Sequence, residues 1–188
     1  DVTTRPTTQP RDHAECVAAL RDHDIVLPTL GDAFRAAAFA EAGAPRCRLL
    51  ANFGAGYNHI DIDAAHAAGV AVSNTPGAVT DATADIAMTL MLTAARRAGE
   101  AERMVRAGAW QGWHPVQMLG LHVTGKTVGI IGMGRIGQAI ARRCHFGFGM
   151  EVVYYNRSAK PVDFPARQLP DLAQVMAAAD VVITAVPA

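Results

Sequence analysis

TVGIIGMGRIG, residues 127–137, is the stretch of this sequence that decides the fold. Its β-branched run, Thr127–Ile131, predicts a strand and leads into the pattern G-x-G-x-x-G. A helix is predicted directly afterwards, from Gln138 to Cys144. Gly132 would allow a tight turn, Gly134 would let the backbone approach a pyrophosphate, and Gly137 would let helix and strand pack closely. Free N–H groups at the helix start would then face the anion. A plain glycine-rich connection is the alternative, but the strand–turn–helix context favours a dinucleotide site.

The end of the next predicted strand indicates which dinucleotide binds. After the strand Glu151–Tyr155 the chain reads Asn156-Arg157-Ser158, with Lys160 two residues further on. In such a fold, an acidic residue at this point accepts hydrogen bonds from the ribose 2′-hydroxyl of NAD. Here a guanidinium can clamp a 2′-phosphate and a serine hydroxyl can donate to it. These four residues therefore predict NADP(H) as the preferred cofactor, with NAD(H) as the second choice; a solvated Arg157 without a ligand is the alternative.

The elements after this motif complete half of a doubly wound parallel sheet. A helix is predicted over Asp171–Ala179 and a third strand over Asp180–Ala185. The expected class is α/β, with an incomplete Rossmann-type dinucleotide-binding domain. Pro76 and Gly77 can continue neither a helix nor a strand, and they place a domain boundary. We therefore predict two partial domains, residues 1–77 and 78–188.

The first of these domains also alternates strands with helices, which is typical of a parallel sheet. Strands are predicted over Asp24–Pro28, Arg48–Phe53 and Val70–Ser73, and helices over Asp32–Ala42 and Asp61–Ala68. Asp61 is a candidate N-cap and Gly69 a stop signal for the second helix.

A long helix is predicted over Asp81–Arg97, with cations at its carboxyl end. It is apolar on more than one face, which predicts burial on several sides, between domains or against a second subunit. Trp110 and Trp113 follow in a loop between Gly108 and Gly120. They either close the domain's own core or anchor an interface.

Composition excludes several classes of function. The 17 basic and 17 acidic residues cancel and are scattered, so no charged surface for nucleic acid is expected. No apolar stretch is long enough to span a membrane, and residues 1–9 lack the apolar core of a signal peptide. The 3 cysteines lie far apart, in no metal-ligand spacing, which predicts buried thiols, no metal site and a cytoplasmic location.

Four motifs together resemble one protein family. They are ANFGAGYNHID at 51–61, NTPG at 74–77, TAD at 83–85 and GMGRIG at 132–137. The sequence resembles the D-2-hydroxyacid dehydrogenases, and within them the glyoxylate/hydroxypyruvate reductase branch. The resemblance implies a dinucleotide-binding domain inserted in a flavodoxin-like substrate domain, of which residues 1–77 would be a part.

The resemblance also implies roles for particular residues. The backbone of Ala55 and Gly56 would hold the carboxylate of a 2-oxo acid, as suits a glycine-rich turn. The expected cofactor contacts are Thr83, the backbone of Arg135 and Ile136, and the loop Ala185, Val186 and Pro187. The helix Asp81–Arg97 and the loop with Trp110 and Trp113 would build a homodimer.

No catalytic residue is assigned within the chain. Family members use an arginine, a glutamate and a histidine on segments that would lie beyond Ala188, so we expect the chain to be an inactive fragment that lacks sequence at both ends. The histidines at 13, 23, 59, 66, 114, 122 and 145 do not match the family's positions. The position of His59 favours simple packing near the turn.

The activity implied for the intact protein is hydride transfer between NADPH and a small 2-oxo acid such as glyoxylate or hydroxypyruvate. A cofactor-sensing, corepressor-like binding protein of the same fold family is one alternative. Phosphoglycerate or formate dehydrogenase is the other.

Overall fold

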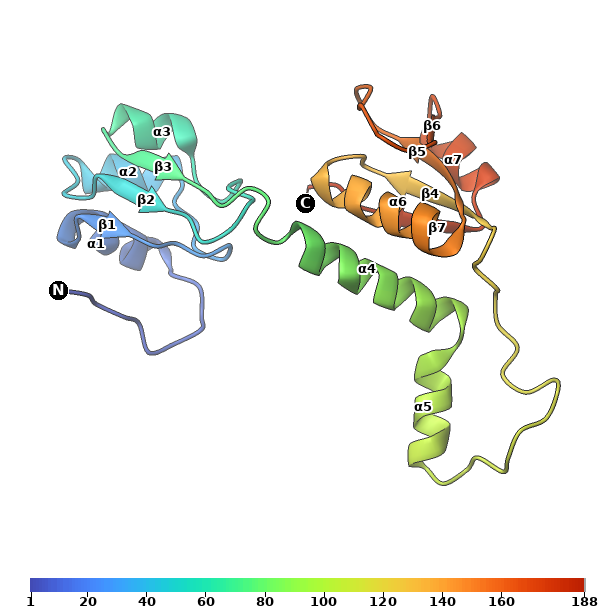
Figure 1. Cartoon of the computed structure of the whole chain (residues 1–188). Helices are drawn as coiled ribbons and strands as arrows, with labels where there is room; N and C mark the ends of the chain where they lie inside the picture. The colour runs from blue at the N-terminus through green and yellow to red at the C-terminus, as the bar shows by residue number, and fades with distance from the viewer. Residues whose placement is uncertain (188) are drawn as a thin grey trace. The chain divides into compact units, whose positions relative to one another are not determined.

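The computed structural model describes residues 1–187 in two compact units, Asp1–Val79 and a second unit that begins at Thr80 (Figure 1). Residue 188, the last of the predicted second domain, lies outside the described residues. Each unit has its own parallel sheet, so the α/β class with parallel sheets is confirmed. None of the helices in this part of the chain has both the length and the hydropathy of a membrane span.

The first unit is a sheet of short parallel strands in the order β1-β2-β3. The strands are β1 (Ile25–Val26), β2 (Leu49–Ala51) and β3 (Ala71–Ser73), and the helices are α1 (His13–Asp22), α2 (Ala36–Ala42) and α3 (Ile62–Ala67). Leu20, Phe34 and Leu50 are fully buried in its core.

Two aspartates near the helices of this unit have different roles. Asp61 caps α3 by accepting from the Ala64 amide at 2.9 Å, as predicted. Asp32 does not start α2, which begins only at Ala36, so the predicted helix Asp32–Ala42 was too long. Its buried carboxylate instead accepts from the amides of Thr29 at 3.0 Å and Arg11 at 2.8 Å, and it stabilises a turn ahead of the helix.

The second unit contains the predicted glycine motif. Its strands are β4 (Thr127–Ile131), β5 (Glu151–Tyr155), β6 (Arg167–Gln168) and β7 (Val181–Thr184), and its helices are α4 (Thr80–Ala95), α5 (Ala98–Arg106), α6 (Arg135–Phe148) and α7 (Leu172–Ala178). All strand pairs are parallel, in the order β6-β5-β4-β7. The order of strands therefore reverses at β4, and the carboxyl ends of β4 and β7 flank the switch point where such sheets bind ligands.

The helix predicted over Asp81–Arg97 is shorter and less buried than expected. α4 ends at Ala95, because Arg97 adopts a left-handed conformation with φ 54° and is the N-cap of α5. Within residues 1–187, α4 buries one face through Met88 and Met91, whereas Ile86 and Leu90 on the opposite face are 61% and 63% exposed. Burial on several sides would therefore need a partner.

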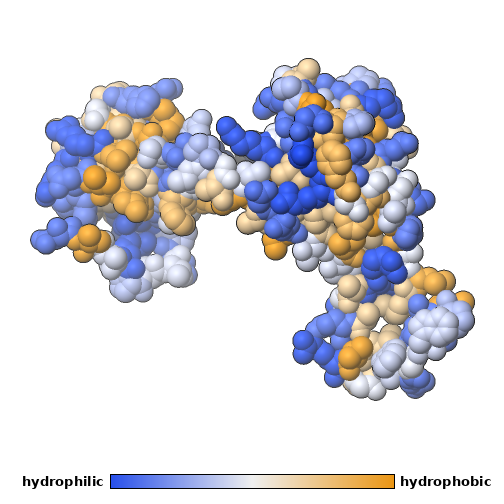
Figure 2. All heavy atoms as spheres, in the orientation of Figure 1, coloured by the Kyte–Doolittle hydropathy of each residue, from blue (hydrophilic) through white to orange (hydrophobic). Residues whose placement is uncertain are grey.

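Helix α5 and the loop that follows it extend away from the sheet of their own unit (Figure 1). No residue of α5 is buried within the described chain. Trp110 and Trp113 in the loop are 54% and 80% exposed, so they do not close the unit's own core. We call α5 and this loop the arm. Figure 2 shows hydrophobic residues on the surface of the arm, among hydrophilic ones.

The thiols of Cys16, Cys47 and Cys144 are expected to resist modification in the folded protein. All three side chains are buried, and burial raises the pKa of Cys16 and of Cys144 to about 11 and also raises that of Cys47. At pH 8 the folded protein therefore holds protonated, inaccessible thiols. Ellman's reagent should react with them only after denaturation; rapid reaction of any thiol in the native protein would contradict this packing.

Candidate functional site

The glycine turn after β4 is packed against the loop after β7. Gly132 has φ +96°, and a Cβ built on it would lie 2.5 Å from the carbonyl oxygen of Ala185. The two segments are held in place by hydrogen bonds from the Gly132 amide to the Tyr155 carbonyl at 2.9 Å and from the Ala185 amide to the Ile131 carbonyl at 2.7 Å. Glycine is therefore required at position 132 for both the turn and the close approach.

The other two glycines of the motif differ sharply in their surroundings. A Cβ on Gly137 would lie 2.0 Å from the backbone oxygen of Gly132, so the first turn of α6 sits directly on the glycine turn. A Cβ on Gly134 would have nothing within 4 Å. The space beside Gly134 is therefore open, which is the property that a ligand approaching the backbone needs.

The amino terminus of α6 presents free amides to this open space. The helix begins at Arg135, earlier than the predicted Gln138, and Gly134 is its N-cap. The first intrahelical bond runs from the Gln138 amide to the Gly134 carbonyl at 2.9 Å. The amides of Arg135, Ile136 and Gly137 find no acceptor in the described part of the chain, so they can bind an anion.

Asn156 links the glycine turn to the end of β5. Its Oδ1 accepts from the Met133 amide at 3.1 Å, and its Nδ2 donates to the Ser158 carbonyl at 2.8 Å. Both ends of the side chain are therefore used within the protein, where they shape the turn 156–158. A direct contact of Asn156 with a cofactor stays a prediction.

The basic residues predicted to read a 2′-phosphate stand at this same edge of the sheet. Arg157 and Ser158 are exposed and Lys160 is half-buried. Neither Arg157 nor Lys160 forms an ion pair with any residue in 1–187. Both charges are therefore available to a ligand.

The remaining predicted cofactor contacts lie in two places. Ala185, Val186 and Pro187 follow β7 at the switch point, where Ala185 touches the Gly132 turn. Thr83 is exposed near the start of α4, and in the described structure no hydrogen bond joins it to the glycine turn. Its proximity to a cofactor stays a prediction.

In the first unit, three consecutive carbonyl groups of the predicted substrate loop, those of residues 54–56, accept hydrogen bonds from asparagine side chains. The buried Asn52 donates through Nδ2 to the carbonyls of Gly54 at 3.0 Å and Gly56 at 2.9 Å. Asn74 Nδ2 donates to the carbonyl of Ala55 at 2.8 Å. The amides of Ala55 and Gly56 have no acceptor among residues 1–187, and successive free amides of this kind can bind a carboxylate.

Asn52 and its partner His59 were missed as site residues at the level of sequence. His59 is buried, and its Nε2 lies 3.0 Å from Asn52 Oδ1. Burial lowers the pKa of His59, with a smaller opposing effect from Asp32 and a lowering effect from Arg35. Both residues lie in the family-like stretch 51–61, but the sequence does not show that their side chains meet.

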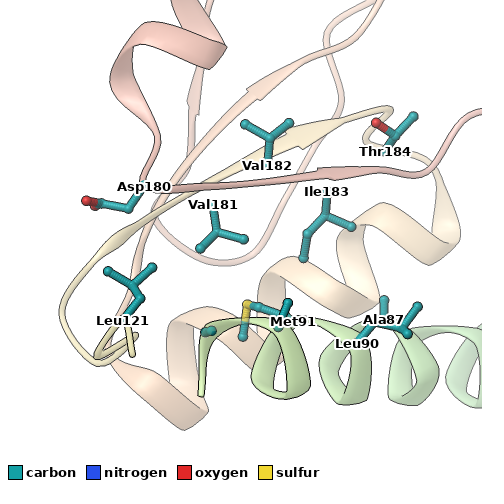
Figure 3. A pocket seen from close by; sticks show the side chains of 11 residues that line it. Ala87, Leu90, Met91, Leu121, Asp180, Val181, Val182, Ile183 and Thr184 are labelled. Carbon is teal, nitrogen blue, oxygen red and sulfur yellow. The ribbon is translucent and has the colours of Figure 1, made fainter. Parts of the chain in front are cut away.

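Two grooves of the second unit are lined in part by α4. A largely apolar groove of about 520 Å³ separates α4 from β7, with Val181 and Ile183 pointing toward the helix (Figure 3). A second groove of about 770 Å³ lies between α4 and α6. There Arg143 pairs with Asp81 at 3.0 Å and Asp85 at 2.9 Å. In residues 1–187 no cluster of three or more His, Cys, Asp or Glu side chains could hold a metal ion.

Known proteins resemble this chain in sequence and in structure. Glyoxylate reductase from Thermococcus kodakarensis is 45% identical over 177 residues, which are 89% of this chain and 51% of that protein. The structure of a glyoxylate reductase from Paecilomyes thermophila matches with a TM-score of 0.77 at 34% identity, over 93% of this chain and 54% of that one. The TT0316 protein from Thermus thermophilus matches with a TM-score of 0.83 at 38% identity, over 93% of this chain and 54% of that one.

The chain thus spans about half the length of the curated relatives that it matches. Residues 88–188 match the family model of the D-isomer specific 2-hydroxyacid dehydrogenase NAD binding domain. This match covers more than half of the chain and includes the glycine turn, the free amides of α6 and the end of β5. The protein therefore belongs to the D-isomer specific 2-hydroxyacid dehydrogenase family.

Proposed function

We propose that the full-length protein is an NADP(H)-dependent D-2-hydroxyacid dehydrogenase that reduces a small 2-oxo acid such as glyoxylate or hydroxypyruvate. The observation that carries the proposal is the open space at Gly134 beside the unpaired amides of α6, at the switch point of a parallel sheet. The similarity to glyoxylate reductases supports the substrate class. On this proposal, residues 1–77 belong to a flavodoxin-like substrate domain and 78–188 to a doubly wound cofactor domain.

The residues at the glycine turn fit a dinucleotide. The amides of Arg135 and Ile136 would hold its pyrophosphate, and Gly134 leaves room for the approach. The exposed Arg157 and Ser158 would hold a 2′-phosphate through a guanidinium fork and a hydroxyl, which favours NADP(H) over NAD(H). When bound, the reduced nicotinamide supplies the hydride for the substrate's carbonyl carbon.

The substrate's carboxylate would be held by the amides of Ala55 and Gly56. The inward-facing carbonyls of this loop leave those amides free, and glycine at position 56 keeps side-chain atoms out of the approach. The chain's own part in the reaction is to bind and orient both reactants.

Steady-state assays of the full-length protein test this function. NADPH should be oxidised in the presence of glyoxylate or hydroxypyruvate, and with NADH the reaction should have a higher KM. Turnover with neither 2-oxo acid, under conditions where the protein is folded, would contradict the proposal and favour a sensing role for the dinucleotide site.

The proposed enzyme is a homodimer through α4 and the arm of α5 and its loop. The exposed Ile86 and Leu90, and the exposed tryptophans of the arm, are apolar surfaces typical of interfaces.

Replacing both Ile86 and Leu90 with glutamate should yield a monomer, because four charges per dimer would be buried without partners. Sedimentation equilibrium would measure the mass. Met176→Glu is the matched control, since Met176 is 64% exposed on α7, away from the proposed interface. A monomeric wild-type protein, or a double variant that dimerises as well as wild type, would contradict this interface.

A further inference from the structure

The amide group of Asn52 holds two carbonyls of the loop 54–56 at once. Its Nδ2 donates at 3.0 Å to Gly54 and at 2.9 Å to Gly56, so both of its N–H bonds are used. The carbonyl of Gly54 also accepts from the Thr75 amide at 3.0 Å, whereas that of Gly56 has Asn52 as its donor. Each carbonyl shares a peptide plane with the N–H of the next residue, so Asn52 and Thr75 fix the direction of the Ala55 N–H, and Asn74, through the Ala55 carbonyl, fixes that of the Gly56 N–H. Asn52 also fixes the following peptide, between Gly56 and Tyr57.

His59 fixes Asn52 in turn. Its Nε2 lies 3.0 Å from Asn52 Oδ1, and because that oxygen can only accept, Nε2 must carry a proton. A flipped Asn52 would place Oδ1 against two carbonyl oxygens and its NH₂ group against His59. The histidine thus selects the one orientation of Asn52 in which both loop carbonyls are satisfied.

The other ring nitrogen of His59, Nδ1, has no hydrogen-bond partner among the described residues. Nδ1 is buried and makes no hydrogen bond within residues 1–187, although buried polar atoms are usually paired. An apolar side chain of similar size would avoid this unpaired atom. The histidine therefore contributes one interaction, the bond to Asn52, at a position where packing alone would favour an apolar residue.

We propose that Asn52 and His59 are positioning residues of the substrate site: by holding the peptides on both sides of the Ala55–Gly56 peptide, they keep the loop in the conformation whose Ala55 and Gly56 amides can bind the carboxylate of a 2-oxo acid. This inference rests on the proposed function. Neither side chain needs to touch the substrate, since both act through the backbone of the loop.

The experiment compares KM values and stability in the full-length protein. His59→Leu removes the unpaired Nδ1 but also leaves Asn52 Oδ1 buried without its donor, so the two effects on stability oppose each other and the variant should fold with a Tm at or slightly below that of wild type. Its KM for glyoxylate should rise by about tenfold. His59→Gln keeps a donor near the position of Nε2 and should restore the wild-type KM. Asn52→Asp, which turns acceptors toward two carbonyls, should raise the same KM by about 30-fold or more.

Two further measurements separate positioning from a structural role. The KM for NADPH should stay unchanged in every variant, and His66→Leu, at an exposed histidine of α3, should change neither KM. An unchanged KM for glyoxylate in folded His59→Leu, whatever its Tm, or failure of His59→Gln to restore that KM, would overturn the inference and leave the proposed function standing. A wild-type enzyme that turns over no 2-oxo acid would overturn both.

Discussion

Replacing Gly137 with alanine is expected to lower the free energy of unfolding of the second unit by about 3 kcal/mol. The new Cβ would lie 2.0 Å from the backbone oxygen of Gly132 and 3.3 Å from Ile130 Cγ2. A backbone atom cannot move aside as a flexible side chain can, so α6 would have to shift away from β4. Urea denaturation of wild type and variant, with the folded signal followed by circular dichroism, measures the difference.

Gly147→Ala is the matched control in the same helix. Gly147 is exposed near the carboxyl end of α6, and a Cβ there would have nothing within 4 Å. Because alanine favours helix over glycine, this variant should be more stable by about 1 kcal/mol. If Gly137→Ala unfolded at the same urea concentration as wild type, the close packing of helix and turn would be contradicted.

Replacing both Arg157 and Ser158 with alanine should raise the KM for NADPH by about 100-fold and leave that for NADH within about twofold of wild type. The reason is that a guanidinium and a hydroxyl would pair only with the 2′-phosphate, which NADH lacks. Arg157 has no ion pair in the described residues, so its removal should not destabilise the fold. Initial rates with each dinucleotide at saturating glyoxylate would give both constants.

Arg48→Ala is the control for loss of charge alone. Arg48 is an exposed arginine of the first unit, and its removal lowers the net charge by the same amount. It should change neither KM. Equal effects of the double substitution on NADPH and NADH would contradict the assignment of these two residues to the 2′-phosphate.

The parts of the fold that depend on short-range patterns could be predicted from the sequence. The predicted bounds of β4 and β5 are those found, because β-branched runs between glycines and charged residues allow few alternatives. The conformations of Gly132 and Gly137 also follow from the motif, since the spacing of its glycines reflects one turn and one close contact.

Other elements depend on contacts that a sequence does not display. α1 is the exception, because its signal is visible in the sequence and was overlooked: Asp12 and Glu15 form a capping box, and Cys16, Val17 and Leu20 follow at helical spacing. α5 was missed because Arg97 takes a left-handed conformation that is uncommon for arginine. β6 has two residues and exists through its pairing with β5.

Some residues of the candidate substrate loop could be predicted from the sequence, and others could not. Ala55 and Gly56 were predicted through the glycine pattern and the family resemblance, and their binding of a substrate stays a prediction. Asn52 was not, because its role depends on a loop that folds back so that one side-chain amide meets two carbonyls. His59 was interpreted as simple packing, whereas the structure gives it a hydrogen bond that orients Asn52.

Titration of NADPH into the wild-type protein and into Gly134→Ala tests the central claim most directly. The added methyl group would meet no protein atom, and Gly134 has an ordinary φ of −77°, so the variant should keep its unfolding midpoint. It would, however, occupy the space that the pyrophosphate is proposed to enter. We expect wild type to bind NADPH and the folded variant to lose that binding; equal binding by both, or a folded wild-type protein that binds neither NADPH nor NADH, would contradict the account.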